Sequence, residues 1–508
     1  MQPRTRFAVR VSEGELAGAA SLPADAVPYG SQLHRRALAD PGGIGLVTVA
    51  PDGSEQGLTW EELDRRANQW ARALTGAGAR LGSLVALAIP NSQDLVLSTL
   101  GCWKIGAVPV PMRWDIPEWE RTRLLDVIKA TVVIDQQNRP AVAAAATRLP
   151  ADPLPEVVSP TVNGICSSGS TGLPKVILNM APAIWTPQHG EPFLAHWAEV
   201  SQPQVILVPG PMYHTNGFNT LNYLLGGDRL IVMEKFGAET VLDAIDRHRV
   251  TNFTATPTML KRMAAVADVE TRDLSSVEWI LQGAAVMPPA LLHKWFELLS
   301  PERVLMAYGM TENLGLTALR GDEWLQHPGS VGRGFRDTEV RILGEDGEPV
   351  PTGELGEIYL RAPMSAGYRY LGGARPLSST EDGFHSAGDI GRLDADGYLH
   401  IADRRTDMIV TGGANVYPAE VESALAEHGD IADVVVLGLS DPEWGRRVHA
   451  VVQPADPSNP PTEQQVIRYA KSRLAAYKVP KSVEFVEEVP RTAATKVNRS
   501  AMIKDRGG

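Results

Sequence analysis

Apolar residues in the first third of the chain alternate between a helical spacing and short continuous runs. Thr59 and Glu62 form a capping-box pattern, which predicts the start of a helix. Apolar residues then recur at helical spacing, at Leu63, Ala67, Trp70 and Leu74. A second helix is predicted at 93–104, and strands are predicted at 84–89, 108–110 and 131–135. This alternation favours a parallel sheet covered by helices.

Five further apolar runs in the middle of the chain are separated by segments of helix length. They predict strands at 205–208, 230–233, 252–256, 278–281 and 304–308. We therefore expect a second doubly wound layer in this part. From Val331 onward, frequent glycines and hairpin signals such as Glu345-Asp346-Gly347 predict a small antiparallel sheet or β-barrel.

The end of the chain has a compact α+β pattern. Helices are expected from Pro418 to His428 and from Thr462 to about Ala476, and strands at 433–439, 448–452 and 483–486. The expected fold class is therefore α/β. A large N-terminal domain (1–403) would contain two doubly wound α/β layers plus a small β-barrel, and a mobile α+β C-terminal domain (404–508) would follow.

The composition is that of an ordinary globular protein, because 44% of the 508 residues are hydrophobic and 21% are charged. The net charge of −12 disfavours non-specific binding to nucleic acid. All of this net charge lies in residues 1–403, since the rest of the chain carries 14 basic and 14 acidic side chains.

Cys102 and Cys166 are the only cysteines, so neither a disulfide framework nor a structural zinc site is expected. Glu13 and Glu15 interrupt the N-terminal segment before any apolar run of a signal peptide. No stretch reaches the roughly 18 apolar residues of a membrane span. We expect a cytoplasmic protein with no nucleic-acid partner and no membrane span, and a homodimer is left open.

The densest chemical signal is the segment from Ile165 to Lys175. Hydroxyl side chains and glycines interleave there, at Ser167, Ser168, Gly169, Ser170, Thr171 and Gly172. Their backbone N–H groups and hydroxyls can converge on an anion, and Lys175 adds a positive charge, so the composition is that of a phosphate-binding loop. It is not a Walker loop, because Pro174 precedes the lysine. Taken alone, a segment of this composition is more often a flexible connection than a nucleotide site.

Four more motifs follow in order: Tyr308-Gly309-Met310-Thr311-Glu312, Ser386-Ala387-Gly388-Asp389, Asp403-Arg404 with Gly412-Gly413, and Pro490 to Lys496. Together with the phosphate loop, they resemble the adenylate-forming superfamily, which includes acyl-CoA synthetases, peptide-synthetase adenylation domains and firefly luciferase. The resemblance covers nearly the whole chain. It implies a hinge near Arg404 and a reaction in two steps, in which a carboxylate attacks the α-phosphorus of ATP and a second nucleophile then takes the acyl group.

The resemblance also implies roles for the residues of these motifs. The loop from Ser167 to Lys175 would bind phosphates, Glu312 would be an oxygen ligand for Mg²⁺, and Thr311 would lie beside the α-phosphate. Residues expected around the adenine and the adjoining pocket are Tyr308, Gly309, Gly283 and Ala284. Asp389 would accept hydrogen bonds from the ribose hydroxyls, and Arg404 would complete that clamp from the hinge. A turn aspartate and a solvated loop charge are the alternatives for these last two.

Lys496 is the principal catalytic candidate. By resemblance, this lysine contacts both the carboxylate and the α-phosphate in the first step and leaves when the small domain rotates. A surface lysine in a basic tail is the alternative, because ten Lys or Arg and only four acids follow Gln464. Both interpretations can hold, since the tail's cations, such as Arg473, Lys478 and Lys481, would suit the phosphates of coenzyme A.

His214 is the candidate beside the substrate carboxylate, and a purely structural histidine is the alternative. Amino-acid-activating members of the superfamily carry an aspartate near this position to pair the substrate ammonium, whereas no acid occurs between 211 and 227. A non-amino carboxylic acid is therefore expected. A mainly apolar pocket for a carbocyclic, aryl or medium-chain acid is expected from Gly283, Ala284, Ala285, Met310, Phe218 and Met259.

The acceptor of the second step is less clearly indicated. Coenzyme A is the leading hypothesis, with ATP and Mg²⁺ in the first step. An amine or amino acid is the alternative, as in the coronafacic acid ligases, because Thr406 and Thr495 replace the usual pivot residue and the usual glycine before the terminal lysine. Val176 and Arg446 also depart from the usual pattern. A nucleotide sensor without turnover is a third interpretation, which Lys496 together with Glu312 disfavours.

Overall fold

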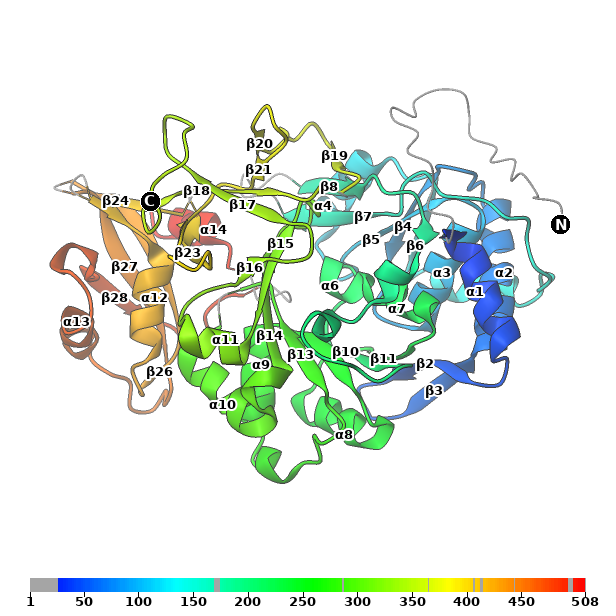
Figure 1. Cartoon of the computed structure of the whole chain (residues 1–508), viewed down its shortest axis with the longest axis horizontal. Helices are drawn as coiled ribbons and strands as arrows, with labels where there is room; N and C mark the ends of the chain where they lie inside the picture. The colour runs from blue at the N-terminus through cyan, green and yellow to red at the C-terminus, as the bar shows by residue number, and fades with distance from the viewer. Residues whose placement is uncertain are drawn as a thin grey trace.

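The computed structural model describes residues 26–507, apart from 169–173, 286, 364, 405–406, 412–413, 443 and 492–496. Figure 1 shows a large N-terminal body and, at the end of the molecule away from the N-terminus, a smaller body formed by the last part of the chain. The α/β fold class predicted from the sequence is confirmed. None of the helices in the described part is long and apolar enough to cross a membrane.

A nine-stranded sheet forms the centre of the large body, in the order β16-β15-β14-β13-β12-β10-β11-β2-β3. The neighbours from β14 to β2 pair in parallel, whereas β3, β15 and β16 are antiparallel at the edges. The strands are β2 (Ile44–Val49), β3 (Glu55–Thr59), β10 (Val205–Val208), β11 (Arg229–Met233), β12 (Asn252–Ala255), β13 (Trp279–Gln282), β14 (Val304–Gly309), β15 (Leu316–Arg320) and β16 (Arg333–Gly334). The five strands predicted in the middle of the chain are confirmed.

Successive side chains of these strands enter two separate cores, because neighbouring residues of a strand point to opposite faces. Leu230 and Val232 join one core, and Ile231 and Met233 join the other. The first core includes side chains of α1 (Tyr29–Ala39), α2 (Trp60–Gly76), α3 (Gln93–Lys104), α6 (Thr215–Phe218) and α7 (Thr220–Gly226). The second includes side chains of α8 (Ala238–His248), α9 (Pro257–Ala264) and α10 (Pro289–Leu299). The sheet is thus covered on both faces, as a parallel sheet requires.

A second layer contains a parallel sheet, β5-β4-β6, and an antiparallel sheet, β19-β8-β7. Its elements are β4 (Leu84–Ala88), β5 (Val108–Pro111), β6 (Val132–Asp135), β7 (Asn163–Ser168), β8 (Pro174–Asn179), β19 (Tyr368–Leu371), α4 (Glu118–Ile128) and α5 (Arg139–Ala146). The predicted capping box is present, since the Thr59 side chain accepts from the Glu62 N–H at the start of α2. Within α3, every residue from Leu95 to Lys104 is buried, which explains its lack of a polar face.

The glycine-rich part forms the predicted antiparallel sheet, in the order β20-β21-β18-β22-β23 with β17 paired to β18. Its strands are β17 (Glu339–Leu343), β18 (Gly356–Arg361), β20 (Ser378–Ser379), β21 (His385–Ser386), β22 (Asp389–Leu393) and β23 (Leu399–Arg404). The remaining short elements of this body are β1 (Val27–Pro28), β9 (Ile184–Trp185) and α11 (Gly321–Gln326), with 3-10 turns at Pro187–Gly190, Phe193–His196, Val269–Thr271 and Pro301–Arg303.

The small body has a three-stranded sheet, β26-β27-β28, and a hairpin, β24-β25. Its elements are β24 (Ile409–Thr411), β25 (Ala414–Val416), α12 (Pro418–Ala426), β26 (Ile431–Asp441), β27 (Gly445–Pro454), α13 (Glu463–Lys471), β28 (Ser482–Phe485) and α14 (Arg499–Asp505). The helix expected to reach Ala476 ends at Lys471, so that prediction was too long. The Ser472 hydroxyl donates to the carbonyl of Tyr469 at the end of the helix, and a separate 3-10 turn, Ala476–Lys478, follows.

Candidate active site

The parallel strands of the large sheet end along one edge, and the sequence motifs follow those ends. His214 follows β10, Gly283 follows β13, and Thr311 and Glu312 follow β14. Ligands of open α/β sheets bind outside the carboxyl ends of the strands. The fold therefore brings to one edge three segments that are far apart in the sequence.

A buried charged cluster surrounds Glu312, whose side chain is 7% exposed. The Nζ atom of Lys175, at the start of β8, lies 3.2 Å from Oε1 of Glu312 and 3.1 Å from the hydroxyl oxygen of Tyr370 in β19. The Tyr370 hydroxyl donates to the same Glu312 oxygen. Burial, and then the adjacent Glu312 carboxylate, raise the pKa of Tyr370, so its hydroxyl keeps the proton that it donates.

This cluster fits a bound magnesium ion. A carboxylate oxygen is the type of ligand that Mg²⁺ takes in proteins. The Oε1 atom of Glu312 also already faces a cation, the ammonium group of Lys175. Lys175 is partly exposed and lies next to the expected phosphate loop. The carboxylate expected to bind the metal and the lysine expected to bind phosphate therefore lie side by side.

The residues expected at the nucleoside also come together. The Tyr308 hydroxyl donates to Oδ2 of Asp389 at 2.7 Å, and Asp389 is only 5% exposed. Arg404 is the Cα partner of Asp389 in the β22–β23 pair, although its side chain lies outside the described residues. Gly309, the last residue of β14, is exposed beside Tyr308. Tyr308, Asp389 and the backbone of Arg404 thus lie together, and the ribose clamp remains a prediction.

The residues expected to form the acid pocket include His214 at the start of α6 and Gly283 after β13. His214 is half-buried at the start of α6, and its ring centroid lies 4.6 Å from that of Tyr213. A Cβ atom added to Gly283 would approach Nδ2 of Asn216 to 3.4 Å. The absence of a side chain at Gly283 thus leaves space between the strand end and α6.

The loop after β13 has a constrained backbone. Ala284 has a φ of 74°, in the left-handed region that an alanine seldom occupies. The buried Gln282 side chain donates to the carbonyls of Gly283 and Ala285 and so holds this turn. Strained backbone of this kind is concentrated at functional sites.

Three residues expected to line the acid pocket also take part in core packing. Phe218 is buried against Trp103, edge to face. Met259 is buried in the core under α8 to α10, while Met310 packs against the core of the antiparallel sheet. Core packing therefore holds these three side chains in place.

Several predicted residues lie outside the described part of the chain: Gly169, Ser170, Thr171, Gly172 and Lys496. Ser167 and Ser168 are described only as the end of β7. The two residues that flank 492–496 form an antiparallel bridge, Arg491 with Val497.

The ends of the 492–496 segment are held close to the large body. Arg491 forms an ion pair with Asp433, with 2.6 Å between Nε and Oδ2. The residue before Asp433, Ala432, accepts a hydrogen bond from Lys261 of α9 through its carbonyl. Since α9 follows β12, this contact joins the small body to the carboxyl edge of the large sheet.

Tyr370 is the site residue that the sequence did not reveal. Its contacts with Lys175 and Glu312 depend on the pairing of β19 with β8, which joins segments almost two hundred residues apart. In the sequence, Tyr370 lies two residues after Tyr368, which is the spacing of aromatic residues in an ordinary strand. This spacing does not indicate a site residue.

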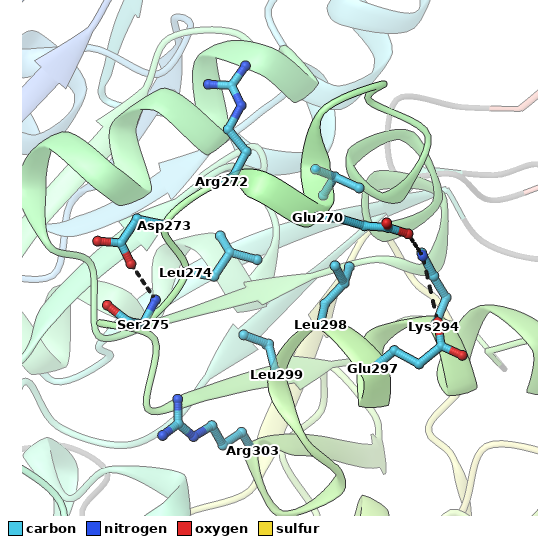
Figure 2. Close-up of a pocket in the computed structure, with 11 residues that line it drawn as sticks. Glu270, Arg272, Asp273, Leu274, Ser275, Lys294, Glu297, Leu298, Leu299 and Arg303 are labelled. Atoms are coloured by element: carbon cyan, nitrogen blue, oxygen red, sulfur yellow. Dashed lines mark hydrogen bonds and ion pairs between the residues drawn. The ribbon is translucent and has the colours of Figure 1, made fainter.

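A surface hollow of about 550 Å³ lies between the 3-10 turn Val269–Thr271 and α10. Figure 2 shows that Lys294 of this hollow lies between Glu270 and Glu297 and pairs with both. The hollow also contains Arg303, which precedes β14, so it lies toward the amino ends of the strands. It is separate from the carboxyl-edge site.

The basic tail is largely paired with acids. Arg473 forms an ion pair with Glu427, and Lys478 forms one with Glu420. Lys481 instead lies 5.1 Å from the ring centroid of Trp444, whose exposed fraction is 40%. Among the described tail residues, this aromatic and ammonium pair is the exposed surface best suited to an anionic ligand with a flat ring.

Family models match most of the chain. One, described as AMP-binding enzyme, matches residues 33–369, and another, described as AMP-binding enzyme C-terminal domain, matches residues 420–496. A feruloyl-CoA synthase from an Amycolatopsis species is 34% identical over 464 residues, which are 87% of this chain and 92% of that protein.

Solved structures with the same fold include two ligases. An o-succinylbenzoate coenzyme A synthetase from Bacillus subtilis, in complex with ATP and a magnesium ion, is 26% identical with a TM-score of 0.80, covering 94% of this chain and 100% of that one. An amide bond synthetase from Marinactinospora thermotolerans is 26% identical with a TM-score of 0.77, covering 94% and 99%.

Proposed function

This chain belongs to the family of AMP-binding enzymes, and from that premise we propose that it activates an aryl or carbocyclic carboxylic acid and transfers the acyl group to coenzyme A. It is an AMP-forming carboxylic acid ligase, which uses ATP and Mg²⁺ and forms an acyl-adenylate with release of pyrophosphate. The proposal concerns the class of acid, the roles of individual residues and the division into domains.

The observation that carries the choice of acid is the absence of Asp and Glu from the sequence segment that contains His214. The chain has no Asp or Glu from 211 to 227, and the next one, Asp228, is directed elsewhere. Its Oδ1 accepts the Gln204 N–H, it is 2% exposed, and it precedes β11 at the amino edge of the sheet. This segment therefore offers no counter-charge to a substrate ammonium, which disfavours an amino acid.

The names of two similar proteins agree with an aromatic acid. One is a feruloyl-CoA synthase and the other an o-succinylbenzoate coenzyme A synthetase, and both acids contain a benzene ring. At Gly283 an added Cβ would already contact Asn216, so the absence of a side chain keeps this position open.

Each group has a proposed part in the first step. Glu312 holds the magnesium ion, which neutralises charge on the leaving pyrophosphate. Lys175 binds phosphate, Asp389 accepts from the ribose hydroxyls with Tyr308 beside it, and His214 faces the substrate carboxylate. Thr311 donates to the α-phosphate.

Lys496 is the proposed catalytic cation that stabilises the five-coordinate phosphorus. The contact of Lys261 with Ala432 supports this role, because Ala432 precedes Asp433, the ion-pair partner of Arg491, and Lys261 belongs to the large body. We also propose that the two domains divide at the end of β23, as 1–403 and 404–508.

Coenzyme A is the proposed acceptor because Trp444 and Lys481 present an exposed ring and an ammonium together. These groups suit the adenine ring and the phosphates of that ligand. An amine acceptor is the second candidate, favoured by Thr406 and Thr495 and by the similarity to the amide bond synthetase.

The free thiols Cys102 and Cys166 agree with a proposed cytoplasmic location, where thiols stay reduced.

A screen of pyrophosphate release tests the proposal. A panel of aryl, carbocyclic, fatty and amino acids is supplied with ATP and Mg²⁺, alone and then with coenzyme A or an amine. Release with aryl or carbocyclic acids, and a thioester seen by mass spectrometry when both acceptors are present, is the expected result. Preference for amino acids would refute the acid assignment, and amide as the sole product would establish the second candidate.

A further inference from the structure

Tyr370 lies in the site but has no part in the function described so far. The Oε1 atom of Glu312 is contacted by two donors, the Tyr370 hydroxyl and the Lys175 ammonium, which also contact each other. We propose that Tyr370 is a positioning residue whose hydroxyl holds the Glu312 carboxylate for magnesium, while Lys175 occupies the place of the metal until it arrives with ATP. This inference rests on the proposed function.

The position of Tyr370 relative to Lys175 is fixed by the backbone. Tyr370 pairs with Ile177 and Leu371 pairs with Val176, so the β19–β8 ladder holds Tyr370 beside the start of β8. Glu312 lies on a different element, in the segment after β14. The Tyr370 hydroxyl thus joins the metal carboxylate to the strand that carries the phosphate lysine. Hydrogen-bond partners of this kind orient metal ligands.

The ammonium of Lys175 compensates a charge that would otherwise be costly. A carboxylate as buried as Glu312 needs a counter-charge, and Lys175 supplies it at 3.2 Å. A metal ion takes over that task when it binds, because both cations contact the same carboxylate. Lys175 is then released for phosphate binding.

The ring of Tyr370 limits how far the released lysine moves. The Nζ atom of Lys175 lies 4.3 Å from the ring centroid, within the range of a cation–π contact. The side chain of Lys175 is 23% exposed, so it can turn without entering the core. The hydroxyl thus orients Glu312 while the ring keeps the ammonium nearby.

The first experiment removes only the hydroxyl, with Tyr370→Phe. Binding of Mn²⁺, a paramagnetic substitute for Mg²⁺, is measured by electron paramagnetic resonance in the presence of α,β-methylene-ATP. We expect affinity to fall about tenfold, as for other partners of metal ligands. The matched control is Tyr398→Phe, because the Tyr398 hydroxyl donates to Glu323 at 3.0 Å outside the site. Unchanged Mn²⁺ affinity in Tyr370→Phe would overturn the positioning role.

Turnover provides a second reading of the same variant. The Mg²⁺ concentration that gives half-maximal pyrophosphate release should rise about tenfold in Tyr370→Phe, with kcat restored at saturating metal. A fall of kcat that excess Mg²⁺ does not restore would contradict a role in positioning the metal ligand.

The second experiment tests the exchange of cations with Lys175→Met. Without nucleotide, this variant should bind Mn²⁺ at least about threefold more tightly than the wild type, because the competing ammonium is gone. The control is Lys294→Met, which breaks an equivalent pair with Glu270 at the remote hollow. Equal or weaker binding by Lys175→Met would overturn the exchange. These titrations measure metal binding and need no turnover, so an unexpected result would overturn only this inference. The proposed function would be refuted by a different result, the absence of pyrophosphate release by the wild type.

Discussion

Replacing Glu312 with glutamine distinguishes the effect of this side chain on metal binding from its effect on folding stability. The change removes one negative charge and keeps the size of the side chain. The glutamine oxygen can still accept from Tyr370 and Lys175, whose bonds to Glu312 are present in the structure. We therefore expect the free energy of unfolding to change by about 1 kcal/mol or less.

Catalysis should respond far more strongly than stability to Glu312→Gln. Loss of one group that stabilises developing charge costs about 10² to 10³ in rate, or about 2.7 to 4 kcal/mol of transition-state stabilisation. The assay is acid-dependent pyrophosphate release at several Mg²⁺ concentrations, with thermal unfolding of the same samples. The control is Glu323→Gln, since Glu323 also accepts from a tyrosine hydroxyl but lies outside the site. Wild-type Mg²⁺ dependence in Glu312→Gln would refute the reasoning.

Three other substitutions test separate parts of the account. Trp444→Ala should raise the KM for coenzyme A about tenfold and leave acid-dependent ATP–pyrophosphate exchange unchanged; equal effects on both steps would contradict the acceptor site. Lys104→Met removes the ammonium 2.7 Å from buried Asp64, which keeps His34 and Asn68 as partners, so urea denaturation should show a loss of about 1–3 kcal/mol, and unchanged stability would contradict this. Burial raises the pKa of Asp228 to about 7, so the folded wild type binds a proton that the unfolded chain releases near pH 4, and its stability should fall as pH rises from about 4 to about 7. Asp228→Asn should remove that slope in unfolding measured at about pH 5 and about pH 8, and a retained slope would assign it to another group.

The sequence predicted the parallel strands well because each is a short apolar run between helix-length segments. Buried strands such as β10 and β11 need apolar residues on both faces, and that requirement is visible without knowing their neighbours. The end of α13 was predicted less well. A Ser472 side chain that bonds the backbone stops the helix, and an apolar spacing does not show this.

The order of the motifs predicted which segments come together, since those containing His214, Gly283 and Glu312 each follow a parallel strand that ends at the same edge. Glu312 and Asp389 remain site residues predicted from the sequence, and the structure adds the hydrogen bond from Tyr308 to Asp389. Tyr370 could not be predicted, since its role depends on the register of β19 with β8. The pairing of Lys478 with Glu420 also joins distant segments, so composition alone overstated the free positive charge of the tail.

Exchange of radiolabelled pyrophosphate into ATP tests the central claim most directly, because it reports the first step without any acceptor. The wild type should exchange label only when a non-amino carboxylic acid is present. In Lys496→Ala, the exchange rate should be about 10²- to 10³-fold lower than in the wild type, and the variant should still bind ATP. Exchange that needs no acid, or an unchanged rate in Lys496→Ala, would contradict the account.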